Sequence, residues 1–262
     1  MRPQSRQCER SEVEHVRKFV AYAKLRLNKT AYYPPYGGHR CMVALALYSK
    51  CITVAEATLA LLDAGFSDEA YGMTRTLIDI FFSLRYISNK DTDARARLYF
   101  EFVSKDVAGW HDLARDYFPQ LQQPMRARTI TTAARYRSPH SWSGKTVRDL
   151  AMEPDTVDVN NKGKPFDYDF AYRCMYRETS HYVHPTIVAL MSHLVRAGSD
   201  QFVVHSGRHL KDKSFDAVFN VADYVGQTMM CFYRCMGDPQ PDRVGTWAGV
   251  VTKHLLRRHR GS

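Results

Sequence analysis

The stretch that decides the fold runs from Arg40 to Leu62 and reads RCMVALALYSKCITVAEATLALL. It has no glycine or proline and is apolar nearly all round, which is typical of a helix buried by its neighbours. Gly65 follows it, and Ser67 opens a second helical pattern that covers residues 69–88. Because the connection is so short, the sequence predicts an antiparallel pair of helices.

Further helical patterns extend outward from this pair in both directions along the chain. Apolar residues recur at helical spacing in each of them, and no linker divides the chain. One short segment, residues 201–205, has the pattern of a strand. The sequence therefore predicts a single all-α domain over residues 1–262. The flanking helices are expected at about residues 11–27, 91–117, 186–196, 213–236 and 244–259.

Composition limits the class of protein. The chain has 262 residues, of which 45% are hydrophobic and 24% charged, so it can bury a core and is not mainly disordered. We find neither a signal peptide nor a run of about 18 uninterrupted apolar residues, so we expect a cytoplasmic protein with no membrane partner. The net charge of +10 favours RNA, a nucleotide or another phosphate-bearing partner, although solubility alone would also account for it.

Residues 168–185 hold an unusual concentration of reactive groups and read YDFAYRCMYRETSHYVHP. The absence of internal glycine or proline predicts one helix, which Pro185 ends. Arg177, His181 and His184 stand at i, i+4 and i+7, so they are expected within roughly 40° of one another on one face. We treat these three residues as the candidate site.

These groups suit the cleavage of RNA by its own 2′-hydroxyl. That reaction needs a base for the hydroxyl proton, an acid for the leaving oxygen and a cation for the phosphorane. The imidazoles of His181 and His184 fit the first two roles, and the guanidinium of Arg177 fits the third. Ser180, at the edge of the same face, and Tyr182 are expected to support them.

A second candidate group lies on the helix expected at residues 69–88. Arg75 and Asp79 stand at i and i+4 on an otherwise apolar pattern. One interpretation is an intrahelical ion pair at the edge of the core. The other is that Arg75, held by Asp79 and by Glu56 across the helix pair, faces the helix that carries the histidines. The sequence leaves both interpretations open.

Two motifs together resemble a known group of proteins. They are Arg75-Thr-Leu-Ile-Asp79 and, about ninety residues later, Tyr176-Arg177-x2-Ser180-His181-x2-His184-Pro185. This arrangement resembles uncharacterised bacterial proteins of the HEPN (higher eukaryotes and prokaryotes nucleotide-binding) superfamily, over roughly residues 40–200. The resemblance implies a HEPN-like antiparallel helical bundle, to which this chain adds N- and C-terminal helices.

The resemblance also implies a function. Many HEPN proteins share an R-x4–6-H motif and act as metal-independent ribonucleases in toxin–antitoxin and phage-defence systems, usually as dimers. Arg177-x6-His184 fits that spacing, whereas Arg177-x3-His181 is one residue short. The implied protein is a homodimeric endoribonuclease that uses no cofactor or metal and has an antitoxin or regulatory partner.

Two alternatives stay open beside the ribonuclease. Glu178 follows the arginine where nuclease members commonly have Asn, Asp or His, and it would add negative charge beside the phosphate. This favours a non-catalytic module that binds a nucleotide, RNA or protein through the same cleft. Arg177, His181 and His184 could also form a closed polar network between helices. A zinc site with Cys174 is disfavoured because the three ligands lie too far apart along one helix.

Overall fold

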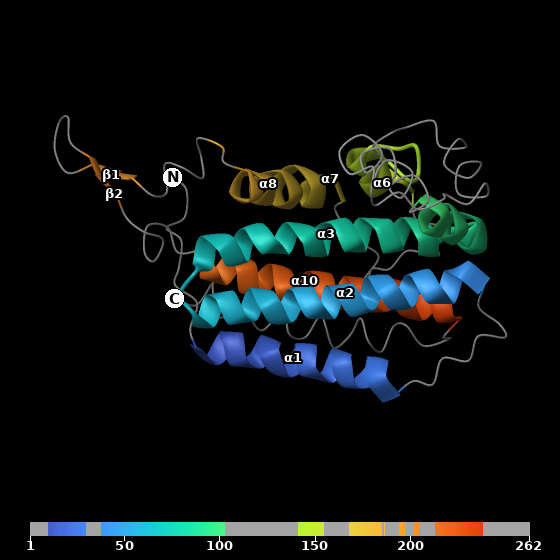
Figure 1. The fold of residues 1–262 in the computed structure, drawn as a ribbon, viewed down its shortest axis with the longest axis horizontal. Coiled ribbons are helices and arrows are strands. Elements are labelled where there is room, and N and C mark those ends of the chain that lie inside the picture. The colour runs from blue at the N-terminus through green and yellow to red at the C-terminus, as the bar shows by residue number, and fades with distance from the viewer. Residues whose placement is uncertain are drawn as a thin grey trace, which may run out of the picture.

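Four long helices dominate the architecture (Figure 1). The computed structural model describes residues 10–29, 38–102, 141–154, 168–184, 186, 194–196, 202–204 and 213–237. These residues are mostly helical, so the predicted all-α class is confirmed. The long helices are α1 (Arg10–Lys29), α2 (Gly38–Asp63), α3 (Ser67–Asn89) and α10 (Ser214–Met236), and residues 92–102 form a further helical segment.

The core lies where α2, α3 and α10 meet, and α1 covers α2 and α10 from outside. α2 and α3 form the predicted antiparallel pair, and Gly65 in their connection has a φ of +83°, which favours glycine. The Tyr48 ring stacks on Phe232 with ring centres 4.7 Å apart. Apolar side chains at helical spacing in α1 are buried as predicted: Val16, Phe19, Val20 and Ala23.

The sequence predicted that α2 is buried nearly all round, but one side of it is exposed. Thr53, Glu56 and Ala60 are exposed along one side of it, because neighbouring helices cover the other sides. Among the described residues, α2 is the one helix long and apolar enough to cross a membrane by length and composition. The core helix of a helical bundle meets the same criteria, and α2 packs against α1, α3 and α10.

A layer of short helices lies along the face of α3 that points away from α2 (Figure 1). It contains α6 (Val147–Met152), α7 (Tyr168–Phe170), the π-helix η3 (Ala171–Tyr176) and α8 (Arg177–Val183). The buried guanidinium of Arg85 donates hydrogen bonds to three carbonyl oxygens at the end of α6 and lies 3.6 Å from the centre of the Tyr168 ring. Arg85 thus fastens α6 and α7 to α3.

A short antiparallel hairpin is the one β element among the described residues. β1 (Leu194–Arg196) pairs with β2 (Phe202–Val204), and Val195 lies opposite Val203. The strand expected at residues 201–205 is confirmed, whereas the helix expected at residues 186–196 is wrong at its end. A short apolar run is compatible with a helix or a strand, and pairing with a second strand decides between them. The basic helix expected at residues 244–259 lies outside the described residues.

Candidate functional site

Residues 168–184 form the predicted helical run, but the run is irregular. Its middle section, η3, is a π-helix, a form that often marks functional sites. Regular α-helix resumes at Arg177 and ends at Val183. His184 caps the helix with an extended backbone (ψ of 149°), and its N–H bonds the Ser180 carbonyl at 3.2 Å. The backbone therefore leaves the helical path after His184.

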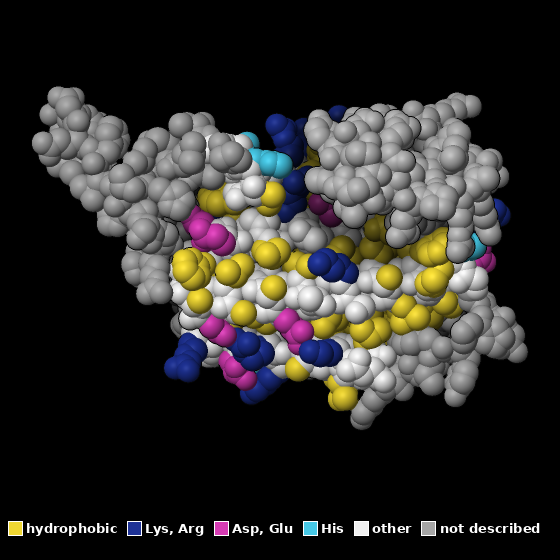
Figure 2. Space-filling view, viewed as in Figure 1, with side chains coloured by type: hydrophobic (Ala, Val, Ile, Leu, Met, Phe, Trp, Pro, Cys, Tyr) yellow, Lys and Arg dark blue, Asp and Glu magenta, His cyan; other side chains and the backbone are white. Residues whose placement is uncertain are grey.

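The three candidate catalytic side chains are open to solvent. Arg177, His181 and His184 are all exposed, and histidine side chains are visible on the surface over α8 (Figure 2). The Arg177 side chain makes no hydrogen bond or ion pair with another described residue. Arg177 and His181 are one turn apart, about 6 Å along the helix axis. The described part of the chain thus shows no closed polar network around them.

Tyr182 packs α8 against the bundle, whereas Ser180 bonds within its own helical run. Ser180 Oγ donates a hydrogen bond to the Tyr176 carbonyl at 2.7 Å. The Tyr182 ring packs edge-on against Tyr71 of α3, with ring centres 5.2 Å apart. Gly72 allows this close contact, because a Cβ there would lie 3.2 Å from Tyr182 Cβ and 3.3 Å from the Tyr182 carbonyl. Tyr182 therefore positions the helix that carries the candidate site, whereas the hydrogen bond of Ser180 stays within that helix.

Arg75 lies beneath the junction of η3 and α8. Its Nη2 donates a hydrogen bond to the Tyr176 hydroxyl, and its guanidinium carbon is 4.6 Å from the centre of that ring. Arg75 Nε is 4.0 Å from Asp79 Oδ2, so the expected ion pair is present but long. Burial raises the pKa of Asp79, and Arg75 and a hydrogen bond from the Tyr176 hydroxyl oppose that rise.

The expected contact between Glu56 and Arg75 is wrong. Glu56 lies on the exposed side of α2, where its Oε1 is 2.7 Å from Lys24 Nζ of α1. Tyr176 instead contacts the Arg75 guanidinium from above. The sequence predicted the helix that Arg75 faces, but the residue that contacts Arg75 there is Tyr176 rather than a histidine.

Glu178 is held by a lysine that the sequence did not single out. Lys213 Nζ, just before α10, lies 2.8 Å from Glu178 Oε1 and 3.0 Å from Asp216 Oδ2. The ammonium also lies 4.8 Å from the centre of the Tyr71 ring. Burial would lower the pKa of Lys213, but the two carboxylates outweigh burial and raise it. Lys213 therefore offsets part of the negative charge of Glu178, because the same ammonium also pairs with Asp216.

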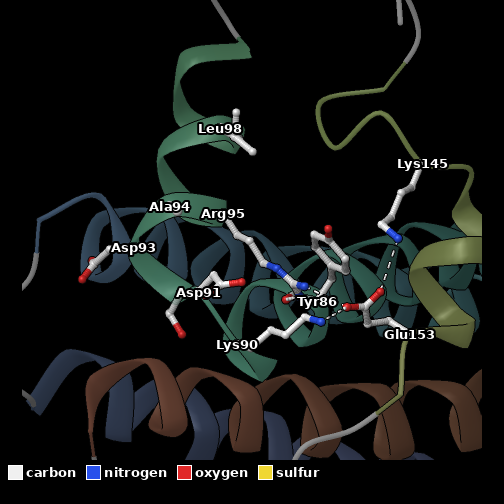
Figure 3. A pocket seen from close by; sticks show the side chains of 10 residues that line it. Tyr86, Lys90, Asp91, Asp93, Ala94, Arg95, Leu98, Lys145 and Glu153 are labelled. Atoms are coloured by element: carbon white, nitrogen blue, oxygen red, sulfur yellow. Dashed lines mark hydrogen bonds and ion pairs between the residues drawn. The ribbon is translucent and has the colours of Figure 1, made fainter. Parts of the chain in front are cut away.

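A second polar group lies at the other end of α3 (Figure 3). Glu153 has a side chain only 9% exposed and pairs with Arg95 at 2.8 Å, Lys90 at 3.2 Å and Lys145 at 3.4 Å. Burial alone would raise the pKa of Glu153, but these cations lower it to about 2. The cluster lines an open pocket of about 740 Å³. Sequence reasoning missed it because its members come from separate segments, each with an ordinary pattern of charges.

No three His, Cys, Asp or Glu side chains among the described residues are placed to hold a metal ion. Cys174 is exposed on η3, whereas Cys231 and Cys235 are free thiols buried in α10. Cys231 and Cys235, one helical turn apart, are accordingly two small core side chains.

Comparisons with known proteins assign the chain to a family through its sequence alone. No curated protein and no solved structure matches it. A family of unknown function, DUF5677, matches residues 42–202, which is more than half of the chain and includes both sequence motifs. That range covers α2, α3, the layer from α6 to α8 and the start of β2. The chain therefore belongs to DUF5677, a family of unknown function.

Proposed function

We propose that this protein is a HEPN-like, metal-independent endoribonuclease of a toxin or phage-defence type, which cleaves RNA on the outer surface of α8. Arg177, His181 and His184 are its candidate catalytic residues. The observation that carries the proposal is the combination of their exposure with the ion pair between Glu178 and Lys213. A polyanion can approach the three side chains, and Lys213 offsets part of the charge of the neighbouring carboxylate from the bundle side.

The chemistry follows from the placement of these groups. A guanidinium binds two phosphate oxygens at once and can offset the charge of a phosphorane. An imidazole one helical turn from that guanidinium can accept the 2′-hydroxyl proton, and a second imidazole can protonate the leaving 5′-oxygen. The nucleophile comes from the RNA, so DNA would be spared.

Three further properties belong to this proposal. The net charge of +10 favours RNA or a nucleotide as partner. The resemblance to HEPN proteins supports a cytoplasmic homodimer, with an antitoxin or regulatory partner that restrains cleavage. It also supports catalysis without a cofactor.

The test is RNA cleavage by purified protein in EDTA. We expect the wild type to cleave single-stranded RNA and Arg177→Ala, His181→Ala and His184→Ala each to lower the rate at least a hundredfold, since one acid–base group alone is worth about 10²–10⁴. His15→Ala, at an exposed position of α1, is the matched control and should keep the wild-type rate. Absence of cleavage of tRNA, rRNA and mRNA by the wild type would contradict the proposal.

One observation favours a non-catalytic module instead. Glu178, the residue after Arg177, has a side chain 47% exposed and shares its lysine with Asp216, so it keeps negative charge where a phosphate would bind. A module of this kind would bind RNA or a nucleotide on the same surface without cutting it. RNA that is retained by the wild type, released by Arg177→Ala and recovered intact would establish this second function.

A further inference from the structure

Arg75 uses fewer of its hydrogen-bond donors than the buried arginines Arg85 and Arg95. Arg85 donates to three carbonyl oxygens, and Arg95 donates to a carbonyl oxygen and to Glu153. Arg75 donates one hydrogen bond, to the Tyr176 hydroxyl, and its buried Nε has no hydrogen-bond acceptor. A guanidinium has five N–H groups, so most donors of Arg75 are unused within the described protein.

The charge of Arg75 is also poorly matched. Its carboxylate partner, Asp79, is 4.0 Å away and its side chain is 41% exposed, so the ion pair is long and screened by water. Arg75 thus keeps a positive charge that no closely bound anion offsets.

The position of Arg75 relates it to the proposed site. Its guanidinium lies against the ring of Tyr176, and the next residue is the exposed Arg177. Consecutive Cα atoms are about 3.8 Å apart, so the two arginines flank the same junction of η3 and α8. Lys and Arg side chains are visible beside the histidines in the space-filling view (Figure 2).

We propose that Arg75 binds a phosphate group of the RNA backbone, next to the phosphate that Arg177 binds, and that Tyr176 holds the Arg75 guanidinium in place. That the polymer is RNA rests on the proposed function, whereas the binding of a phosphate group by Arg75 does not. The side chain of Arg75 is 22% exposed, so part of it reaches solvent while the remainder is fixed by protein. A planar, pre-oriented guanidinium of this kind suits bidentate phosphate binding.

Inorganic pyrophosphate is the probe that separates this inference from the proposed function. Titration calorimetry of the full chain should show binding to the wild type, at least tenfold weaker binding to Arg75→Gln, and a smaller loss for Tyr176→Phe. Arg97→Gln is the matched control, because it removes one positive charge from an exposed ion pair with Glu101 and should bind like the wild type. No binding by the wild type, or equal binding by Arg75→Gln, overturns the assignment.

Arg75→Lys covers the case in which Arg75→Gln fails to fold. It keeps the charge but loses the planar fork, so it should fold like the wild type and bind pyrophosphate several times more weakly. Equal binding by a folded Arg75→Lys would overturn the role of the fork.

A second binding experiment, with RNA in place of pyrophosphate, tests whether the polymer is RNA. With a single-stranded oligoribonucleotide, Arg75→Gln should lower affinity and reduce the salt slope by about 0.7, the value of one phosphate contact on a single strand. If the wild type binds pyrophosphate through Arg75 but cleaves no RNA, the proposed function fails and the phosphate site stands. If RNA is cleaved and Arg75→Gln changes neither its affinity nor its salt slope, the phosphate site fails and the proposed function stands.

Discussion

Lys213 Nζ lies 2.8 Å from Glu178 Oε1 and so joins the residue before α10 to the helix that bears both histidines. The two residues are 35 positions apart, and the contact changes how Glu178 should be interpreted. In the sequence Glu178 adds negative charge next to Arg177. In the structure the Glu178 carboxylate pairs with the half-buried ammonium of Lys213, and this ion pair links α8 to the residue before α10.

Replacing Lys213 should therefore affect both stability and RNA binding. We expect Lys213→Met to lower the free energy of unfolding by about 1–2 kcal/mol, because it leaves Glu178 and Asp216 without their cation. RNA affinity should fall several-fold, since Glu178 is then unbalanced beside Arg177. Urea denaturation and fluorescence anisotropy measure the two effects. The control is Lys24→Met, whose exposed ion pair with Glu56 is worth under about 1 kcal/mol; an equal loss in both variants would contradict the argument.

Gly72 should resist substitution although it lies inside a helix. Alanine favours a helix over glycine by about 1 kcal/mol. Here the new Cβ would lie 3.2–3.3 Å from the Cβ and backbone of Tyr182, so α8 must move outward. We expect Gly72→Ala to lower the free energy of unfolding by about 1 kcal/mol net, because overpacking costs about 1–3 kcal/mol. Urea denaturation tests this, and Thr53→Ala on the exposed side of α2 should by contrast be neutral or slightly stabilising.

Glu153 should be required for the attachment of residues 141–154 to α3. We expect Glu153→Gln to lower the free energy of unfolding by about 3 kcal/mol, because three cations lose a buried partner. The cations lower the pKa of Glu153 from 4.5 to about 2, so the ion pairs stabilise the fold above about pH 4.5 and lose that effect as the pH falls toward 2. Chemical denaturation across this range should show the wild type approaching the variant. A constant difference between them would exclude this explanation.

Asp223 should have the opposite pH dependence. Burial raises its pKa to about 6, which a hydrogen bond from Gln227 only partly offsets. The folded state then holds a proton that the unfolded state releases near pH 4, so this residue costs stability as the pH rises from about 4 through 6. We expect Asp223→Asn to be more stable than the wild type at pH 8 and similar to it at pH 4, as measured by thermal unfolding. Asp63→Asn, at an exposed ion pair with Arg17, should show no such gain.

Much of the helical fold could be predicted from the sequence. Helix periodicity and the positions of Gly65 and Pro185 are local signals, and they predicted α1, α2, α3, α10 and the extent of the run from α7 to α8. The helices depend on residues close together in the chain. The contact between α3 and the histidine-bearing helix does not, and the sequence left it as one of two interpretations of Arg75.

Tertiary structure decided which side chains meet. Arg75 and Tyr176 are 101 positions apart, and Arg95 reaches Glu153, 58 positions away, only because residues 141–154 pack beside α3. The π-helix η3 was not predicted from the sequence, whereas the extended backbone at His184 agrees with its position before Pro185. By itself the sequence determined the helices and the exposed polar face of α8, because both follow from local periodicity. Packing between distant segments decided the partners of Arg75, Glu178 and Glu153, because burial leaves each of these charged groups dependent on neighbours that no local pattern specifies.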